Sequence, residues 1–189
     1  MKTEEVPMDQ VIMNFKDKVK VLADGYRSGS IDVENSDAFF YDVIYAAAEV
    51  YKNDMQLYMP MSNGQMMVYQ EEDRNYIPLY TDKEELMKSG AKEYQTTTLR
   101  EKCAYVYDNL MYYDLLANLD VAVEEGRNLS EIVEYVESNP KFEGVILDPF
   151  TEYPFGMDGW ILKAVMFKGM GVNTFVVIDG ESGEVKYRL

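Results

Sequence analysis

A strand that turns directly into a helix is encoded by the stretch YIPLYTDKEEL, residues 76–86. The residues from Tyr76 to Tyr80 favour β-structure, so they predict a strand. Thr81 and Glu84 have the spacing of a capping box, which opens a short helix, and Gly90 is placed to close that helix. This junction indicates a fold that mixes both kinds of element.

Two helices are predicted before the junction. Apolar residues recur at steps of three and four from Met8 to Tyr26, and a broad apolar face runs from Asp37 to Lys52. The residues Arg27–Ser30 interrupt this pattern. The two helices are therefore expected to form a hairpin that packs on the rest of the chain.

A β-hairpin is predicted between the helices and the junction. Its strands are Gln56–Met61 and Gln65–Gln70, two short β-favouring runs. Asn63 and Gly64 stand between them, and Asn-Gly is a strong signal for a tight turn.

The second half of the chain also alternates between helix and strand. Thr96–Gly126 is predicted to be mainly helical, although Cys103–Tyr107 within it also suits a strand. The further predictions are a helix opened by Asn128 with Glu131 and ending near Asn139, a buried strand Gly144–Leu147, a helix from Asp158 to Gly169, and a hairpin of Asn173–Ile178 with Glu184–Leu189.

These elements predict an α+β fold, with a mixed small sheet, flanking helices, an N-terminal helical hairpin and a C-terminal β-hairpin. Residues 1–54 are expected to form the helical hairpin, and residues 55–189 the main α+β unit on which it packs. A chain of 189 residues is long enough to bury a core and favours one compact domain overall.

The charge balance limits the possible partners. The chain has 34 acidic and 18 basic side chains, which gives a formal net charge of -16. Such a field repels a phosphate backbone. The densest basic group, Lys16, Lys18 and Lys20, lies among acidic residues and is typical of the solvated side of a helix. No nucleic acid partner is expected.

The sequence also predicts a protein of the cytoplasm rather than of a membrane. No run of about eighteen apolar residues occurs, so no membrane-spanning segment is expected. Glu4, Glu5 and Asp9 stand where a secretory leader would have a basic start and an apolar stretch. The one cysteine, Cys103, lies in an apolar pattern and is expected to be an inert, buried thiol in a reducing compartment.

The chain contains no histidine. This excludes Ser-His-Asp and Cys-His nucleophilic machinery within the chain, and it removes the commonest side-chain ligand of transition metals. The acidic clusters Glu71–Asp73 and Glu124–Glu125 lack the spacing of a calcium loop, and Asp179–Glu184 is better explained as a β-turn. No metal and no cofactor are expected.

Two blocks of the sequence resemble the SseB family. Tyr76–Leu86 is similar to the family's strand-to-helix motif "vPlFTseeeL", and Glu143–Phe150 to its strand-and-turn motif "dGivINPfge", with Asp148 in place of the usual Asn. Leu57–Pro60 matches the first strand of the family. The resemblance implies an α+β domain of a bacterial protein, and it supplies no catalytic residue.

The loop from Asp148 to Trp160 is the main candidate for a binding site. Aromatic rings on a loop stiffened by prolines are good anchors for a partner, and they are equally good core residues. Both interpretations stay open for four methionines around the first predicted β-hairpin. The loop residues in question are Asp148, Phe150, Tyr153, Phe155 and Trp160, and the methionines are Met59, Met61, Met66 and Met67.

These features predict a non-enzymatic, protein-binding or regulatory module that engages another protein through an aromatic and methionine-bearing surface. The alternative is a small-molecule sensor or an enzyme that uses Asp148, Glu152 or Asp158 as an acid or base. A third possibility is self-association through an open edge strand of the C-terminal hairpin.

Overall fold

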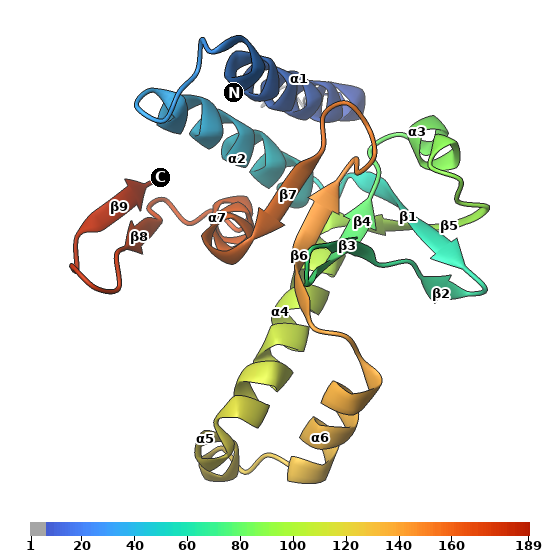
Figure 1. Ribbon diagram of the computed structural model, residues 1–189, viewed down its shortest axis with the longest axis vertical. Helices are drawn as coiled ribbons and strands as arrows, with labels where there is room; N and C mark the ends of the chain where they lie inside the picture. Colours follow the sequence, from blue (N-terminus) through green and yellow to red (C-terminus); the bar gives the residue numbers. More distant parts are fainter. Residues whose placement is uncertain (1–6) are drawn as a thin grey trace, which may run out of the picture.

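The computed structural model describes residues 7–189 and has the predicted α+β fold (Figure 1). The helices of this part of the chain are α1 (Met8–Ser28), α2 (Ser36–Lys52), α3 (Lys83–Lys88), α4 (Leu99–Ala117), α5 (Leu119–Glu124), α6 (Leu129–Ser138) and α7 (Gly159–Gly169). The strands are β1 (Gln56–Ser62), β2 (Gln65–Met66), β3 (Tyr69–Glu71), β4 (Arg74–Leu79), β5 (Glu93–Thr98), β6 (Phe142–Leu147), β7 (Phe155–Asp158), β8 (Val176–Ile178) and β9 (Val185–Arg188).

Two small sheets lie at the centre of the molecule. The first has the strand order β3-β4-β6-β7, in which β4 and β6 are parallel and the other neighbours antiparallel. The second has the order β2-β1-β5 and is antiparallel throughout. Tyr58 and Tyr80 join the two sheets by exchanging backbone hydrogen bonds of 2.9 and 2.8 Å. Because β4 and β6 are parallel, both strands end at the same edge of the first sheet.

The N-terminal helical hairpin shares one hydrophobic core with the sheets. Helix α1 packs on α2, and α2 packs on α7 (Figure 1). Phe15 and Ile44 of the hairpin are buried in the same cluster as Leu147 of β6. Helices α2 and α7 approach closely at Gly169, where an added Cβ would lie 2.3 Å from the Tyr51 ring. The absence of a side chain at Gly169 therefore permits this contact.

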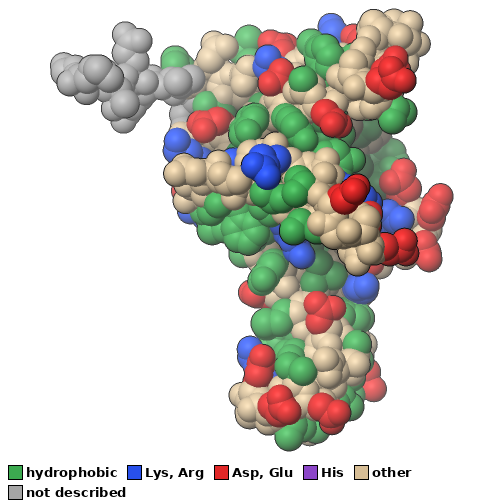
Figure 2. Space-filling model, turned by 90° about the vertical axis from the view of Figure 1, so that its left-hand side faces the viewer, with side chains coloured by type: hydrophobic (Ala, Val, Ile, Leu, Met, Phe, Trp, Pro, Cys, Tyr) green, Lys and Arg blue, Asp and Glu red, His purple; other side chains and the backbone are tan. Residues whose placement is uncertain are grey.

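Helices α4, α5 and α6 form a projection that points away from the sheets (Figure 1), and Figure 2 shows it as a narrow stalk with acidic side chains at its tip. The far end has a small cluster of its own, built on Leu115, Ala122 and Ile132. At the base, the buried Asn109 amide donates to the Pro140 carbonyl at 3.1 Å and accepts from the Phe142 N–H at 2.9 Å. These bonds tie α4 to the start of β6.

The strand predictions need three corrections, one of which is β7 (Phe155–Asp158) within the predicted loop from Asp148 to Trp160. The predicted strand Gln65–Gln70 is divided, because β2 returns along β1 for two residues only and Tyr69–Glu71 joins β4 in the other sheet. The long partner of β1 is β5, through six residue pairs from Gln56↔Thr98 to Met61↔Glu93. No strand is predicted at β5, since four exposed residues, Glu93–Thr96, hide any apolar alternation.

The helix predictions fit the structure more closely. Thr96–Gly126 is mainly helical as predicted, and Cys103–Tyr107 belongs to α4. Cys103 is buried, and burial raises the pKa of its thiol to about 12, so the thiol is inert at neutral pH. Asn128 opens α6 as predicted, its side-chain oxygen accepting from the Ser130 N–H at 3.0 Å. The C-terminal hairpin of β8 and β9 is also confirmed.

Within residues 7–189, no helix is both long and apolar enough to cross a lipid bilayer. Glu4 and Glu5, on which the prediction of no secretory leader depends, lie outside the described residues.

Candidate functional site

The loop between β6 and β7 starts at the sheet edge where β4 also ends. The Asp148 N–H donates to the Leu79 carbonyl at 2.8 Å. The Asp148 carboxylate accepts two hydrogen bonds from Thr81, one from its backbone N–H and one from its hydroxyl, each 2.8 Å long. The Asp148 side chain therefore fastens the end of β6 to the strand-to-helix junction.

This arrangement corrects the predicted cap of α3. Asp82, not Thr81, is the N-cap residue, and its Oδ1 accepts from the Glu84 N–H at 2.6 Å and the Glu85 N–H at 3.4 Å. The Thr81 hydroxyl is instead used by Asp148, because a hydrogen bond to a buried carboxylate is stronger than a bond to a backbone amide at a helix end.

The Asp148 carboxyl is buried, and its environment decides what it can do. Burial raises the pKa of this carboxyl above its usual value, while the hydrogen bonds from Thr81 and the charge of Lys16 act in the opposite direction. Both carboxylate oxygens are already occupied by Thr81. In this geometry Asp148 is a structural tie between two segments and not a free acid or base.

The Phe150 side chain points into solvent. This residue is 80% exposed, and its φ of 60° lies in the left-handed region that a residue with a Cβ avoids. Its ring stands edge-on to the Tyr69 ring of β3, with the centroids 5.2 Å apart. The next residues fix the loop, since the Thr151 hydroxyl donates to the Asp148 carbonyl at 2.6 Å and accepts from the Tyr153 N–H at 3.3 Å.

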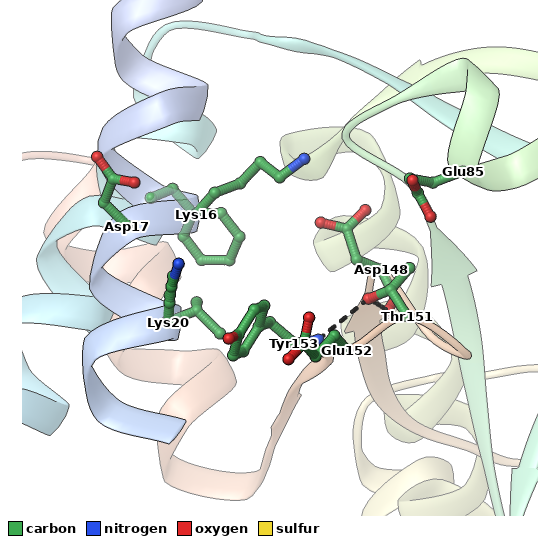
Figure 3. A pocket seen from close by; sticks show the side chains of 10 residues that line it. Lys16, Asp17, Lys20, Glu85, Asp148, Thr151, Glu152 and Tyr153 are labelled. Carbon is green, nitrogen blue, oxygen red and sulfur yellow. Dashed lines mark hydrogen bonds between the residues drawn. The ribbon is translucent and has the colours of Figure 1, made fainter. Parts of the chain in front are cut away.

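A cleft of about 430 Å³ lies between α1 and this loop (Figure 3). In this view the Lys16 side chain extends from α1 toward Asp148. The charged groups of the lining have both signs, and acidic ones outnumber basic ones. They are Lys16, Asp17, Lys20, Glu85, Asp148 and Glu152.

The loop is fastened to α1 at one end of this cleft. The Tyr153 hydroxyl donates to an Asp24 carboxylate oxygen at 3.0 Å, and the Arg27 guanidinium donates to the Glu152 carbonyl at 2.8 Å. The same guanidinium lies 5.1 Å from the centre of the Tyr153 ring, within cation–π range. Tyr153 is therefore engaged in holding the loop on the helix.

The other two predicted aromatic residues belong to the core or pack on it. Phe155 is buried and packs edge-on against Phe15 with the ring centroids 6.0 Å apart. Trp160 is half-buried and stacks on Tyr187 of β9, with centroids 4.5 Å apart. The five predicted residues thus separate into Asp148 and Tyr153 at the cleft, Phe150 in solvent, Phe155 in the core, and Trp160 half-buried against the core.

Of the candidate acid–base residues, Asp148 and Asp158 do not form a pair. Asp158 lies opposite Gly144, near the start of β6, whereas Asp148 follows the end of that strand. Gly144 and Asp148 are four positions apart along the chain, which corresponds to about 13 Å of strand. The Asp158 carboxylate accepts from the Tyr76 hydroxyl at 2.8 Å and makes no cap bond to α7, contrary to the prediction. Glu152 lines the cleft near Asp148.

Sequence reasoning did not identify Lys16, Lys20 or Tyr69 as site residues. The two lysines are four residues apart and so share one face of α1, but nothing in the pattern shows that this face meets the β6–β7 loop. Tyr69 reaches Phe150 only through the pairing of β3 with β4. Of the four methionines around the first β-hairpin, Met59 and Met61 are buried in the core, Met66 is half-buried and Met67 is exposed.

Residues 7–189 contain no group of three or more Cys, Asp or Glu side chains placed to hold a metal ion. Asp179 closes a turn, as predicted, by accepting from the Glu181 N–H at 3.0 Å and the Ser182 N–H at 2.9 Å. Its other oxygen pairs with the Lys186 ammonium at 2.8 Å.

In comparisons with known proteins, the chain matches no family model, no curated protein and no solved structure.

Proposed function

We propose that this chain is an SseB-like, non-enzymatic module that binds another protein, with Phe150 as the anchoring residue. The observation that carries the proposal is the state of Phe150, which is 80% exposed at a φ of 60°. A side chain in the left-handed region costs about 1–2 kcal/mol, and an exposed ring gains nothing from burial. A strained and exposed aromatic residue, held by a hydrogen-bonded loop, has the properties of a preorganised contact.

Further exposed apolar residues precede Tyr69 in the chain. Met67 and Val68 are exposed and lead directly to Tyr69, whose ring contacts Phe150. We call these four residues the Phe150 patch. Apolar patches of this kind on a charged protein are typical of recognition sites.

The chemistry of the partner follows from the charge of the chain. At a net charge of -16, encounter with a basic protein is favoured and encounter with an acidic one is opposed. The partner we propose presents an apolar pocket for Phe150 with basic residues around it.

The link to the SseB family is supported by the way the two similar blocks meet. Tyr76–Leu86 and Glu143–Phe150 form adjacent parallel strands, β4 and β6, and Asp148 of one block bonds to Thr81 of the other. The setting we propose is a bacterial cytoplasm. The inert Cys103 thiol is compatible with this setting.

Native mass spectrometry of the gently isolated protein tests the proposal. We expect a co-purifying basic polypeptide that is lost in Phe150→Ala and retained in Val33→Ala, a control at an 89% exposed residue of the α1–α2 loop. Retention of the polypeptide by Phe150→Ala would remove Phe150 from the interface.

A small-molecule sensor is the second candidate, and the 430 Å³ cleft is the observation that favours it. A ligand there would meet Lys16 and Lys20 on one side and Glu152 on the other. In the same mass spectra, a small mass lost in Lys16→Ala and kept in Phe150→Ala would select this candidate over the protein-binding module.

A further inference from the structure

Strand β5 leaves one side of its sheet open. The strand order is β2-β1-β5, so β5 has β1 on one side and no strand on the other among residues 7–189. Glu93, Tyr94, Gln95 and Thr96 are all exposed. The sheet has two edge strands, and β5 with six residues is longer than β2 with two.

The pairing with β1 shows which backbone groups face outward. Tyr94 lies opposite Pro60, which has no N–H, so this pair does not exchange hydrogen bonds. In an antiparallel pair the bonded and unbonded positions alternate, and Thr96 therefore also points its N–H and carbonyl away from β1. The residue opposite Thr96 is Tyr58, and its backbone N–H and carbonyl bond to Tyr80 on the other side of β1. Tyr58 and Thr96 therefore do not bond to each other, as this alternation requires.

The open edge lacks the features that normally protect an edge strand. Natural proteins place prolines, bulges or inward charges at such edges, or make the strands very short. The residues Tyr94–Thr98 carry no charge and no proline, in a chain whose net charge is -16. Two other edge strands do have such features. Strand β2 is only two residues long, and β3 is three residues long and ends in the charged Glu71.

We infer that β5 pairs with β5 of a second copy of this chain, antiparallel, with the two-fold axis at Gln95. In this register Tyr94 of each copy lies opposite Thr96 of the other copy. The outward N–H and carbonyl groups of both residues are then paired. The two copies then share one six-stranded sheet with the order β2-β1-β5-β5-β1-β2. This surface is separate from the Phe150 patch, so the inference does not depend on the proposed function.

The charges of the strand and the start of α4 favour this register. With the axis at Gln95, Glu93 faces Thr97 and Lys92 faces Thr98, so no like charges oppose each other. An axis at Thr96 would set Glu93 opposite Leu99, the first residue of α4, so the ladder would run into the helix. An axis at Tyr94 would leave Thr97 and Thr98 unpaired.

The edge is also the place where two acidic chains can approach. Lys83 lies over the Tyr94 ring at 4.7 Å, and Lys92 precedes Glu93, so positive charge borders the uncharged strand. The remaining long-range repulsion between the copies is screened by salt. The dimer should therefore become tighter as the salt concentration rises.

Disulfide trapping tests the register directly. At the axis the two copies of Gln95 form an unbonded pair whose Cα atoms are about 4.5 Å apart, so Gln95→Cys should give a covalent dimer under mild oxidation. Glu93→Cys is the matched control on the same exposed strand. In the proposed register, residue 93 of one copy lies opposite residue 97 of the other. The two introduced cysteines are therefore four residues, about 13 Å, apart along the strand, which is too far for a disulfide. The native Cys103 is buried and does not interfere. Equal trapping of both variants would overturn the inference.

Sedimentation measures the dimer without cross-linking. Gln95→Lys places two ammonium groups side by side, and we expect it to raise the dimer dissociation constant at least about fivefold. Gln65→Lys makes the same change on exposed β2 and should leave the constant unchanged. A monomer at all protein and salt concentrations, an equal effect of the two lysines, or a monomer that pairs β5 with a strand of another protein would each overturn the inference.

Discussion

The backbone conformation of Phe150 carries a cost that glycine would remove. Its φ of 60° is unfavourable for any residue with a Cβ, whereas glycine adopts it without a steric cost. We expect Phe150→Gly to be more stable than Phe150→Ala by about 1 kcal/mol, with both variants losing the partner. Urea unfolding measures the difference. Equal stabilities would show that the loop holds this conformation without strain.

Asp148 should make the stability of the protein depend on pH in an unusual direction. Its folded pKa is raised by burial, so its contribution to stability is present below the unfolded pKa and is lost as pH rises through the folded pKa. The side chain introduced by Asp148→Asn would be neutral at every pH, and its amide could still accept from the Thr81 N–H and donate to the Thr81 hydroxyl.

We therefore expect Asp148→Asn to be more stable than the parent protein at pH 7, with a difference that closes as the pH falls to about 3.5. Denaturant unfolding across this range gives the measurement. Asp148→Ala is the reference variant, since it leaves the Thr81 groups without a partner and should lose about 2 kcal/mol at neutral pH. A difference between Asp148→Asn and the parent that did not vary with pH would contradict the role of the buried charge.

At the scale of elements, one buried amide ties the projection of α4–α6 to the start of β6. Asn109 donates to the Tyr135 hydroxyl and the Pro140 carbonyl, each at 3.1 Å, and accepts from the Phe142 N–H at 2.9 Å. We expect Asn109→Ala to cost about 2–3 kcal/mol, because buried polar groups are left unpaired. Hydrogen exchange should show faster exchange at the Phe142 amide and in α6.

Asn118 provides a matched control for this prediction. It is exposed, lies between α4 and α5, and makes no side-chain cap bond. Asn118→Ala should change the free energy of unfolding by less than about 0.5 kcal/mol. A comparable loss in both asparagine variants would mean that the Asn109 hydrogen bonds do not hold the projection.

Local signals in the sequence were sufficient for most elements. The amphipathic period of α1 and α2, the Asn128 cap of α6 and the strand-to-helix junction all depend on residues a few positions apart. Strand β5 could not be found in this way, because its partner β1 lies more than thirty residues earlier in the chain. The prediction that Thr81 caps α3 was wrong for a similar reason. Asp148, which is distant in sequence, binds the Thr81 hydroxyl instead.

The candidate loop was chosen by its composition, and its geometry could not be predicted from sequence. Part of the aromatic loop lines the cleft, but sequence does not show where strand β7 begins. Once Phe155 starts β7, its side chain turns into the core, while the left-handed conformation of Phe150 turns that ring outward. The basic side of the cleft, from α1, follows from packing between segments more than a hundred residues apart.

At the scale of the whole molecule, the net charge of -16 should destabilise the folded chain by self-repulsion. Potassium chloride screens this repulsion, so we expect the urea midpoint to rise between about 20 and 500 mM salt, with most of the gain at the lower concentrations. Measurements at protein concentrations where the chain is monomeric separate this effect from pairing of β5. A midpoint that did not respond to salt would mean that the acidic groups are too widely spaced to repel.

The hydrogen bond between Asn109 and the Phe142 amide also has an evolutionary consequence. Asn109 lies where α4 leaves the body of the protein and Phe142 lies where the chain returns, and the side-chain oxygen of Asn109 accepts from the Phe142 N–H at 2.9 Å. The intervening residues 110–141 are therefore an exchangeable cassette, since a segment whose two ends are held together can be replaced with little change to the rest of the fold. A lineage can lengthen, trim or replace this cassette in a single genetic event while the sheets and the Phe150 loop are inherited unchanged.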